Sequence, residues 1–437
     1  MKIESIRIQG YRSLADLDLT PHEFTVLVGP NNAGKTNVVS SLAFLANVYG
    51  SGIKQALDRH GGFENVAFRS DGASLRTMSF EVTASGSIDD IWGNPPTFPR
   101  PERDAIGLDS TTMRVRFRHR FTLWGQGEPL ISRFHIASEE LEVGIGDGPL
   151  TPLLRADRTD SRVDVRVESP HLLGWLGLPW LTFGIDAETY LARVMRPEVL
   201  PHDLLISGLQ TISLVVAAFV EHMSMMQTFQ FSPPACRLPT APTPIANLGM
   251  HGDNLPALVN RLKEQPGEAW ANVMENMALI LPELEDIVVE PTPERLWRLD
   301  FKEVGFGNRW SSDEVSDGTI RALALFTSLY DPRSSLLAIE EPENSLHPWA
   351  LRVLVSACQR VARSTEPKQI LLTTHSPVLI DQLHPSEIAV VWKEEGRTKL
   401  APLMAFEPDV EASWMDGAFK LSNLLDSGLI RQTVPTP

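Results

Sequence analysis

A glycine-rich segment near the N-terminus restricts the fold of this chain more than any other part of its sequence. Residues 29–36 read GPNNAGKT, which fits the phosphate-loop pattern G-x-x-x-x-G-K-[ST]. The segment follows a short apolar stretch at residues 24–28 and precedes a predicted helix over residues 35–47. A phosphate loop requires this order of strand, loop and helix. The motif therefore predicts an α/β domain that binds a nucleotide.

The residues of this loop have different predicted roles. Its glycines allow successive backbone N–H groups to surround the β-phosphate, and the dipole of the following helix adds positive potential. Lys35 should reach the β- and γ-phosphates, and the hydroxyl of Thr36 should ligate Mg²⁺. ATP and Mg²⁺ are therefore the predicted cofactors. The predicted nucleotide-binding residues of the loop are Gly29, Pro30, Asn31, Asn32, Ala33, Gly34, Lys35, Thr36 and Asn37.

A pair of acids ends a second apolar stretch, where residues 336–342 read LLAIEEP. Open α/β sheets bind their ligands at the carboxyl ends of the strands. We predict that Glu340 ligates Mg²⁺, commonly through water, and that Glu341 is the general base or orients the attacking water. Taken alone, two acids after a strand are also typical of a solvated strand end. The phosphate loop elsewhere in the chain favours the catalytic interpretation.

Two further motifs place polar groups where a predicted strand ends or a predicted helix begins. Residues 373–377 read TTHSP after a predicted strand, so His375 could contact the γ-phosphate and detect its loss. The alternative is a capping or buried structural histidine. Residues 315–319 read VSDGT and open a predicted helix, where Ser316 and Gly318 could offer a hydroxyl and N–H groups to an anion. A simple helix N-cap would explain the same residues.

The order of these motifs resembles that of ABC-type ATPases, in particular the SMC-, RecF- and OLD-like branch and bacterial AAA-type ATP-binding proteins. The matching segments lie towards the two ends of the chain and cover less than half of it, whereas the middle matches only loosely. The segments are GYRSL (10–14), GPNNAGKTN (29–37), SDGTIRAL (316–323), LLAIEEPENSLHP (336–348) and TTHSPVLID (373–381).

The resemblance implies a site shared between two copies of the chain. Ser316 and Gly318 would contact the γ-phosphate held by the other copy, so the complete site would form only in a head-to-tail homodimer or a higher assembly. Residues 344–346 would form the D-loop at this interface. Arg12 would lie beside the nucleotide, and His375 would be the catalytic switch residue.

The chain departs from the family pattern in several respects. Glu340 stands where Asp is usual, and the segment before the first predicted sheet offers no Q-loop glutamine. No heptad pattern is long enough for a coiled coil. The stretch after Thr398 is too short for the nuclease domain of OLD-type relatives. We therefore expect any effector, such as a nuclease, to be a separate chain.

These features lead to one principal hypothesis and two alternatives. The resemblance to ATPase subunits of anti-phage defence systems implies an ATP hydrolase whose nucleotide-dependent dimerisation controls a partner effector. The first alternative is an ATP-bound scaffold that hydrolyses slowly or not at all and holds an effector inactive. The second is a RecF-like DNA repair factor. The net charge of −16 disfavours DNA as a ligand, because non-specific DNA binding depends on Lys and Arg.

The composition and the order of predicted elements indicate the compartment and the fold class. Two cysteines and the lack of a signal peptide predict a cytoplasmic protein, and the apolar segment 172–185 is too short and too rich in Gly and Pro to span a membrane. We predict an α/β ABC-ATPase head with a mixed sheet, an antiparallel β-subdomain, a helical insertion and no long coiled coil. The predicted parts are an N-terminal ATPase lobe with the β-subdomain (1–170), a mainly helical insertion (171–300) and a C-terminal ATPase lobe (301–437). Strands are predicted at 75–83, 113–123, 131–143 and 162–167, and helical stretches at 203–227, 254–264, 268–280, 318–330 and 348–363.

Overall fold

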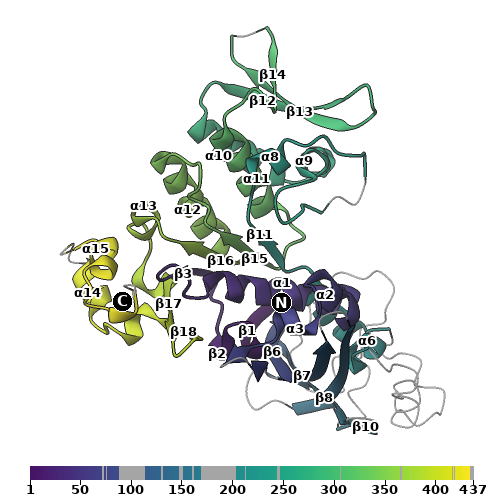
Figure 1. Cartoon of the computed structure of the whole chain (residues 1–437). Coiled ribbons are helices and arrows are strands. Elements are labelled where there is room, and N and C mark those ends of the chain that lie inside the picture. Colours follow the sequence, from purple (N-terminus) through teal and green to yellow (C-terminus); the bar gives the residue numbers. More distant parts are fainter. Residues whose placement is uncertain are drawn as a thin grey trace, which may run out of the picture. The chain divides into compact units, whose positions relative to one another are not determined.

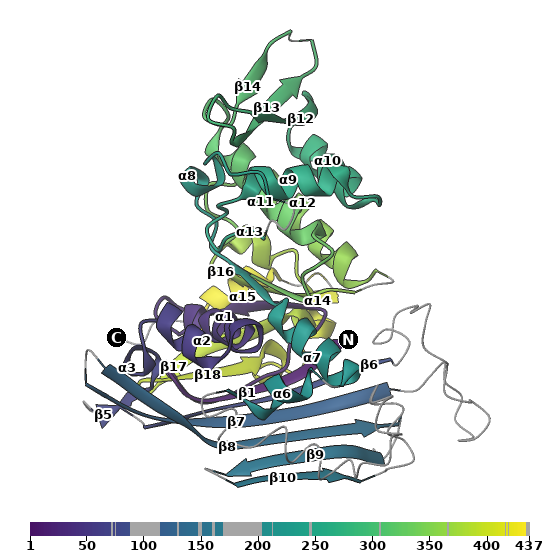
Figure 2. The same cartoon turned by 90° about the vertical axis from the view of Figure 1, so that its right-hand side faces the viewer.

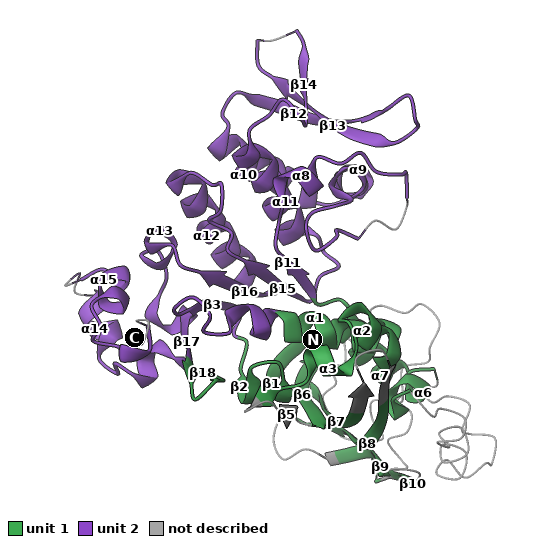
Figure 3. Cartoon of the chain, in the orientation of Figure 1, with its two compact units in different colours: residues 1–21, 40–226, 393–400 green, residues 22–39, 227–392, 401–437 purple. Residues whose placement is uncertain are grey.

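The computed structural model of the chain (Figure 1) divides by its contacts into two compact units. The first comprises residues 1–21, 40–226 and 393–400, and the second comprises residues 22–39, 227–392 and 401–437 (Figure 3). The apolar segment 172–185 lies outside the described residues, and the predicted division into 1–170, 171–300 and 301–437 stays a prediction. The structure describes residues 1–70, 73–74, 76–87, 114–128, 131–146, 151–159, 162–168, 203–211, 213–243, 247–305, 307–364, 367–415, 417 and 419–433.

The first unit is built on a seven-stranded antiparallel sheet in the order β10-β9-β8-β7-β6-β1-β2. Figure 2 shows β7 to β10 of this sheet side by side, and the predicted antiparallel meander is confirmed. Along β7 the buried Val115, Phe117 and Phe121 alternate with polar side chains, as the two faces of a strand require. The strands are β1 (Lys2–Tyr11), β2 (Leu14–Leu19), β6 (Thr77–Ser87), β7 (Arg114–Glu128), β8 (Ile131–Ile145), β9 (Thr151–Thr159) and β10 (Arg162–Val167).

Two strands of this sheet, β2 and β9, were not predicted from the sequence, and β9 contains a proline. Its second residue is Pro152, and a proline argues against a strand because it cannot donate to the hydrogen-bond ladder. In the structure Pro152 is paired with Gly144, next to a register shift between β8 and β9. An irregularity of this kind is a position at which a strand tolerates proline.

Helices complete the first unit, and one prediction here was wrong. The stretch 203–227, predicted as helical throughout, contains two separate helices, and its last residue begins the strand β11 of the second unit. The second helix begins after Ser213, whose Oγ accepts a hydrogen bond from the backbone N–H of Val216 at 3.3 Å and so caps it. Elements of this region and of residues 35–74 are α1 (Lys35–Ser51), α2 (Ile53–Arg59), α3 (Phe63–Val66), β4 (Arg69–Ser70), β5 (Ala73–Ser74), α6 (Leu205–Leu209), α7 (Leu214–Ser224) and β11 (Gln227–Phe229).

A buried chain of polar groups crosses the core of the first unit. The Tyr49 hydroxyl lies 2.8 Å from Nδ1 of His119, and Nε2 of His119 lies 3.0 Å from Oε1 of Glu139. Both His119 and Glu139 are 0% exposed. The Glu139 carboxylate also accepts hydrogen bonds from the backbone N–H groups of Leu205 at 2.7 Å and Ile206 at 3.1 Å. This carboxylate therefore ties α6 to the sheet, and burial together with its charge raises the pKa of Tyr49.

A six-stranded sheet in the order β11-β15-β16-β3-β17-β18 lies mainly in the second unit, and its strands β11, β15, β16, β3 and β17 pair in parallel. All residues of β3, β15 and β16 are buried, as is typical of parallel strands that are covered on both faces. The predicted alternation of strands and helices is confirmed. The elements of this sheet and its helices are β3 (Phe24–Val28), α11 (Asp317–Tyr330), β15 (Leu336–Glu340), α12 (Pro348–Ala362), β16 (Gln369–Thr374), α13 (Pro377–Ile380), η4 (Pro385–Glu387) and β17 (Ile388–Glu394).

The remaining elements of the second unit form a small sheet and short helices. The sheet has the order β12-β13-β14 and is antiparallel, and the chain ends in helices (Figure 1). The elements are α8 (Pro233–Cys236), α9 (Leu255–Glu264), α10 (Ala269–Ile280), β12 (Leu284–Pro291), β13 (Trp297–Glu303), β14 (Arg309–Ser311), η5 (Leu403–Ala405), α14 (Val410–Met415), α15 (Leu421–Asp426) and η6 (Arg431–Thr433). The strand β18 (Arg397–Pro402) is the edge strand of the six-stranded sheet, and its residues up to Leu400 belong to the first unit.

The predicted α/β fold class is confirmed, with parallel and antiparallel sheets, several helices and no long coiled coil in the described ranges. The longest helix described there, α1, has 17 residues. Among the helices that the structure describes, none is long and apolar enough to cross a membrane.

Replacing Glu139 by Ala should destabilise the first unit strongly. The change leaves two buried N–H groups and a buried histidine without their acceptor, a loss of about 3–5 kcal/mol. Urea unfolding followed by circular dichroism would measure it. Glu140→Ala is the matched control, because the neighbouring side chain points to the opposite face of β8. Equal stability of the two variants would contradict the assigned role of Glu139.

Candidate functional site

Three neighbouring strands of the parallel sheet bring the sequence motifs to one edge. In register, Glu340 at the end of β15 pairs with Thr373 of β16, and Thr374 pairs with Val28 at the end of β3. Parallel strands end at the same edge of their sheet, where α/β proteins bind ligands. The phosphate loop follows β3, the acid pair ends β15, and His375 follows β16. All of these residues belong to the second unit.

The phosphate loop has the backbone conformation that an anion-binding turn needs. Asn32 and Gly34 have φ values of 65° and 107°, in the left-handed region that favours Asn and Gly. Gly29 has a second role in packing. A Cβ atom at Gly29 would lie 1.9 Å from the carbonyl oxygen of Val391 in β17, so a larger residue would push the loop off the sheet.

Lys35 is held inside this loop. Its Nζ donates hydrogen bonds to the carbonyl oxygens of Gly29 at 2.7 Å and Pro30 at 3.1 Å, and the side chain is only 7% exposed. Desolvation by burial lowers the pKa of Lys35 to about 8, although the nearby carboxylates of Glu341, Glu343 and Glu340 act to raise it. Phosphate oxygens could replace the two carbonyl acceptors and would stabilise the ammonium form further.

Thr36 and Glu340 meet directly. The Thr36 hydroxyl donates a hydrogen bond to Oε2 of Glu340 at 2.6 Å, and Glu340 is 3% exposed. A hydroxyl and a carboxylate oxygen are the donors that Mg²⁺ prefers, and Mg²⁺ usually completes its shell with water and substrate phosphates. The described ranges contain no preformed group of three or more acid, His or Cys ligands. These two residues therefore fit a Mg²⁺ ion that arrives with a nucleotide.

Glu341 has an unusual backbone conformation. Its φ is 44°, and its N–H donates to the carbonyl oxygen of Thr373 at 3.0 Å. Its Oε2 accepts a hydrogen bond from Nδ2 of Asn344 at 3.0 Å, and Ser345 in the same turn has a φ of 62°. Such conformations cost about 1–3 kcal/mol each for residues with a side chain and cluster at functional sites. A glutamate held this way is a candidate for the residue that acts on the attacking water.

The Ser-Asp-Gly motif forms the start of α11. Ser316 is its N-cap, and its Oγ accepts a hydrogen bond from the backbone N–H of Thr319 at 3.1 Å. The N-cap interpretation thus describes Ser316 in this structure. A Cβ atom at Gly318 would lie 2.8 Å from the carbonyl oxygen of Ser345. Gly318 therefore permits the turn after β15 to pack on α11.

His375 presents an exposed side chain at the same edge. Partial desolvation and the charge of Lys35 lower the pKa of His375, against the opposing effect of Glu341 and Glu343. The imidazole is therefore neutral at neutral pH and can either donate or accept a hydrogen bond.

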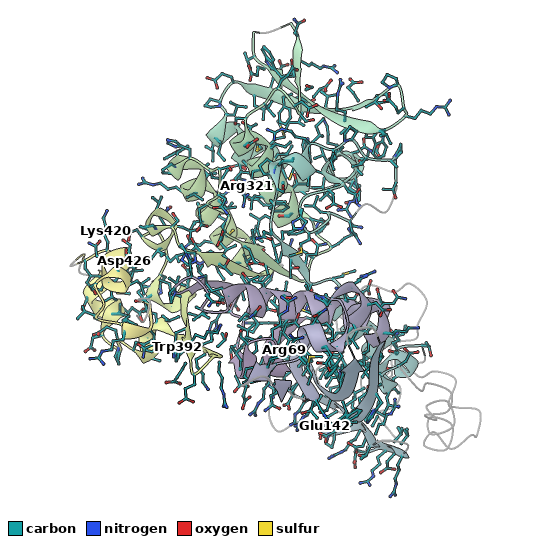
Figure 4. The ribbon with its side chains drawn as sticks, in the orientation of Figure 1. Arg69, Glu142, Arg321, Trp392, Lys420 and Asp426 are labelled. Carbon is teal, nitrogen blue, oxygen red and sulfur yellow. The ribbon has the colours of Figure 1, made fainter. Side chains whose placement is uncertain are left out.

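Three charged residues of this region were not predicted from the sequence. Arg237 donates hydrogen bonds to the carbonyl oxygens of Ser312 and Val315 and forms an ion pair with Asp317. Arg321, labelled on α11 in Figure 4, is buried and donates to the carbonyl oxygens of Phe231 and Glu341. Glu343 is the third. Arg321 lies within the segment SDGTIRAL and Glu343 within LLAIEEPENSLHP, whereas no sequence pattern marks Arg237.

Arg12 belongs to the first unit. Its φ is 47°, its N–H donates to the carbonyl oxygen of Val66 at 2.7 Å, and its guanidinium carbon lies 5.6 Å from the centre of the Tyr11 ring. Its place beside a nucleotide stays a prediction, as do the roles of the other predicted site residues.

Replacing Arg237 by Lys should loosen the start of α11. An ammonium group cannot reproduce the three contacts of the guanidinium, so at least one buried carbonyl loses its donor, at a cost of about 1–3 kcal/mol. Hydrogen–deuterium exchange should rise over residues 312–319. The exposed Arg352 on α12 provides the control, since its exchange to Lys should leave this segment unchanged. Unaltered exchange in Arg237→Lys would refute the anchoring role.

Comparison with solved structures gives SMC head domains, at low similarity. The Smc head domain with an extended coiled coil, bound to the C-terminal domain of ScpA from Pyrococcus furiosus, gives a TM-score of 0.46 at 13% identity and covers 94% of this chain and 99% of that one. The SMC head domain from Thermotoga maritima gives a TM-score of 0.36 at 11% identity, covering 92% and 99%. Likenesses at this level carry no argument about function.

Sequence comparison gives short matches to curated proteins. "DNA replication and repair protein RecF" of Coxiella burnetii is 42% identical over 45 residues, which is 10% of this chain. The match spans only 13% of the length of that relative. The same match recurs in further strains of that organism.

Two family models match the chain over longer segments. The model "AAA ATPase domain" matches residues 1–80, which include the phosphate loop. The model "AAA domain, putative AbiEii toxin, Type IV TA system" matches residues 218–381, which include the α11 motif, the acid pair and His375. The two matched segments are thus similar to AAA-type ATPase domains, and together they contain the phosphate loop, the α11 motif, the acid pair and His375.

Proposed function

We propose that this protein binds ATP with Mg²⁺ and hydrolyses it. The observation that carries the proposal is the hydrogen bond between Thr36 and Glu340, because it brings a phosphate-loop hydroxyl and a buried carboxylate together at the carboxyl edge of the sheet. Lys35 lies in the same loop, and Glu341 follows Glu340 directly. The arrangement offers a cation for the phosphates, oxygen ligands for a metal and a carboxylate for water.

Each residue has a defined task in this proposal. The N–H groups of the loop and Lys35 hold the β- and γ-phosphates, and Thr36 and Glu340 hold Mg²⁺, the latter directly or through water. A Mg²⁺ ion bound by these residues would supply positive charge to the phosphates. Glu341 accepts a proton from the attacking water or orients it. His375, neutral at neutral pH, donates a hydrogen bond to the γ-phosphate and loses this contact after hydrolysis.

We further propose that a second copy of the chain completes the site. Ser316 at the start of α11 and Asn344 and Ser345 in the turn after β15 are exposed. The positive φ of Ser345 is a strained conformation, and strained residues of this kind cluster at functional sites. A head-to-tail dimer in which these residues meet the nucleotide of the other copy would give that strain a function. Dimerisation would then depend on ATP.

The proposed role of the dimer is to control a separate effector, as in anti-phage defence. Support comes from the toxin–antitoxin system named in the description of the family model that matches residues 218–381. The match to a DNA replication and repair protein favours DNA binding as a second candidate.

The charge distribution of the described sheet does not favour DNA. On the exposed face of the first unit's sheet, arginines pair with carboxylates: Arg116 with Glu4, and Arg118 with Glu81. Glu142, labelled in Figure 4, lies 3.5 Å from Arg118 and 3.4 Å from Arg155. Paired arginines release fewer counterions on binding nucleic acid than free ones would. Salt-dependent DNA binding of the purified protein would nevertheless restore this second candidate.

Replacing Lys35 by Ala should reduce ATP turnover on the order of 100-fold or more, because the charge that offsets the phosphates is lost. The variant should fold normally, since burial already disfavours the ammonium in the free protein. A phosphate-release assay measures turnover, and thermal unfolding checks the fold. Lys54→Ala, at an exposed lysine, is the control. A folded Lys35→Ala variant that turns over ATP at the wild-type rate would exclude this site.

Replacing Glu341 by Gln should keep ATP and Mg²⁺ bound but block the attack of water. The amide oxygen can still accept the hydrogen bond from Asn344, so the turn is preserved. The variant should accumulate as an ATP-dependent dimer, measured by light scattering after size-exclusion chromatography. Adding Lys35→Ala to this variant should abolish the dimer. If Glu341→Gln with ATP stays monomeric, dimerisation is not gated by nucleotide at this site.

A further inference from the structure

Glu343 connects the turn after β15 to the segment that carries His375. Its Oε1 accepts a hydrogen bond from the Thr374 hydroxyl at 2.8 Å and from the backbone N–H of His375 at 2.8 Å. The Thr374 hydroxyl in turn accepts from the backbone N–H of Ser376 at 3.0 Å. One carboxylate oxygen thus fixes the three residues in which β16 ends and the following loop begins.

The turn that carries Glu343 is itself held on its other side. Its residues form two successive hydrogen-bonded turns, Asn344 N–H to the carbonyl of Glu341 and Leu346 N–H to the carbonyl of Glu343. The carbonyl oxygen of Ser345 occupies the space that a side chain at Gly318 of α11 would need. A displacement of this turn relative to α11 would therefore move Glu343 and, through it, the His375 backbone.

The second carboxylate oxygen of Glu343 indicates that stability alone does not explain the residue. Oε2 is buried and has no hydrogen-bond partner among the described residues. Leaving such an acceptor unsatisfied costs about 1–3 kcal/mol. A residue selected only to stabilise the loop would satisfy both oxygens or would be smaller.

We propose that Glu343 is a positioning residue, which sets the place of His375 through Oε1 and transmits the position of the turn after β15 to it. The inference rests on the proposed ATP hydrolysis, since His375 acts there on the γ-phosphate. A second copy of the chain that contacts the exposed Asn344 and Ser345 would thereby change the position of His375. Glu343 itself does not touch the phosphates.

Glu343→Ala and Glu343→Gln test the proposal as a pair. Alanine removes the acceptor, so the amides of His375 and Ser376 should exchange hydrogen at least several-fold faster. ATP turnover at saturation should fall about 10- to 100-fold, because small misplacements of a catalytic group cost rates of this order. The affinity for a fluorescent ATP analogue should stay within about threefold, since the residue does not bind the phosphates. Glutamine keeps an acceptor oxygen and should restore most of the protection and turnover.

Glu387→Ala is the matched control. Glu387 is a glutamate that, like Glu343, accepts hydrogen bonds, from the backbone of His384 and from Gln359, but it precedes β17 at the opposite end of the strands. This variant should lower the thermal stability without changing turnover at saturation or the exchange of His375. A similar loss of turnover in Glu387→Ala and Glu343→Ala would show general destabilisation and overturn the proposal.

Failure of the proposed ATP hydrolysis and failure of the positioning role of Glu343 give different results. If the wild-type protein binds ATP without hydrolysing it, the proposed function fails, but the exchange of the His375 amide still tests the contact. Unchanged exchange in Glu343→Ala overturns the positioning role in any case. If wild type hydrolyses ATP and Glu343→Ala does so at the same rate, the positioning role alone is refuted. A Glu343→Gln variant as slow as Glu343→Ala would refute the acceptor role of Oε1.

Discussion

The hydrogen bond between Thr36 and Glu340 joins two residues that lie 304 positions apart in the chain. It can form only if β3 and β15 end at the same edge of one sheet, with β16 between them in parallel register. Parallel strands require long crossover connections, so the intervening chain must fold around this edge. The position of every other group in the candidate site follows from this register, because Lys35 precedes Thr36, Glu341 follows Glu340, and His375 follows β16.

The site contains two kinds of constrained backbone position. One kind is a glycine required by close packing, and the other is a residue with a side chain at a positive φ angle. Gly29 and Gly318 are required by close packing, the former against Val391 and the latter against Ser345. Glu341 and Ser345 instead adopt positive φ angles that a glycine would adopt at lower cost. Side chains kept at such positions indicate that the carboxylate and the hydroxyl have tasks that outweigh the cost in stability. The turn from Glu341 to Leu346 is thus the most constrained segment of the described site.

Charged side chains are arranged differently on the exposed strands and at the candidate site. On exposed strands of both units, basic side chains pair with carboxylates. In the core of the first unit, the buried Glu139 accepts hydrogen bonds from two backbone amides and lies 3.0 Å from Nε2 of His119. At the candidate site, the carboxylates of Glu340, Glu341 and Glu343 lie near Lys35, and burial lowers the pKa of this lysine to about 8. A site of this kind favours an incoming group that brings both negative phosphates and a divalent cation.

Local patterns in the sequence determined the fold class, the phosphate loop, the acid pair and most strands and helices. These features depend on residues that are neighbours in the chain, such as the apolar run before Gly29 or the alternation along β7. The sequence did not reveal β9, because Pro152 is tolerated only through a register shift set by the partner strand. Nor did it reveal the tasks of Arg237 and Glu343. Their hydrogen bonds reach residues 31 to 78 positions away, and only the tertiary structure decides which distant carbonyl or amide a side chain meets.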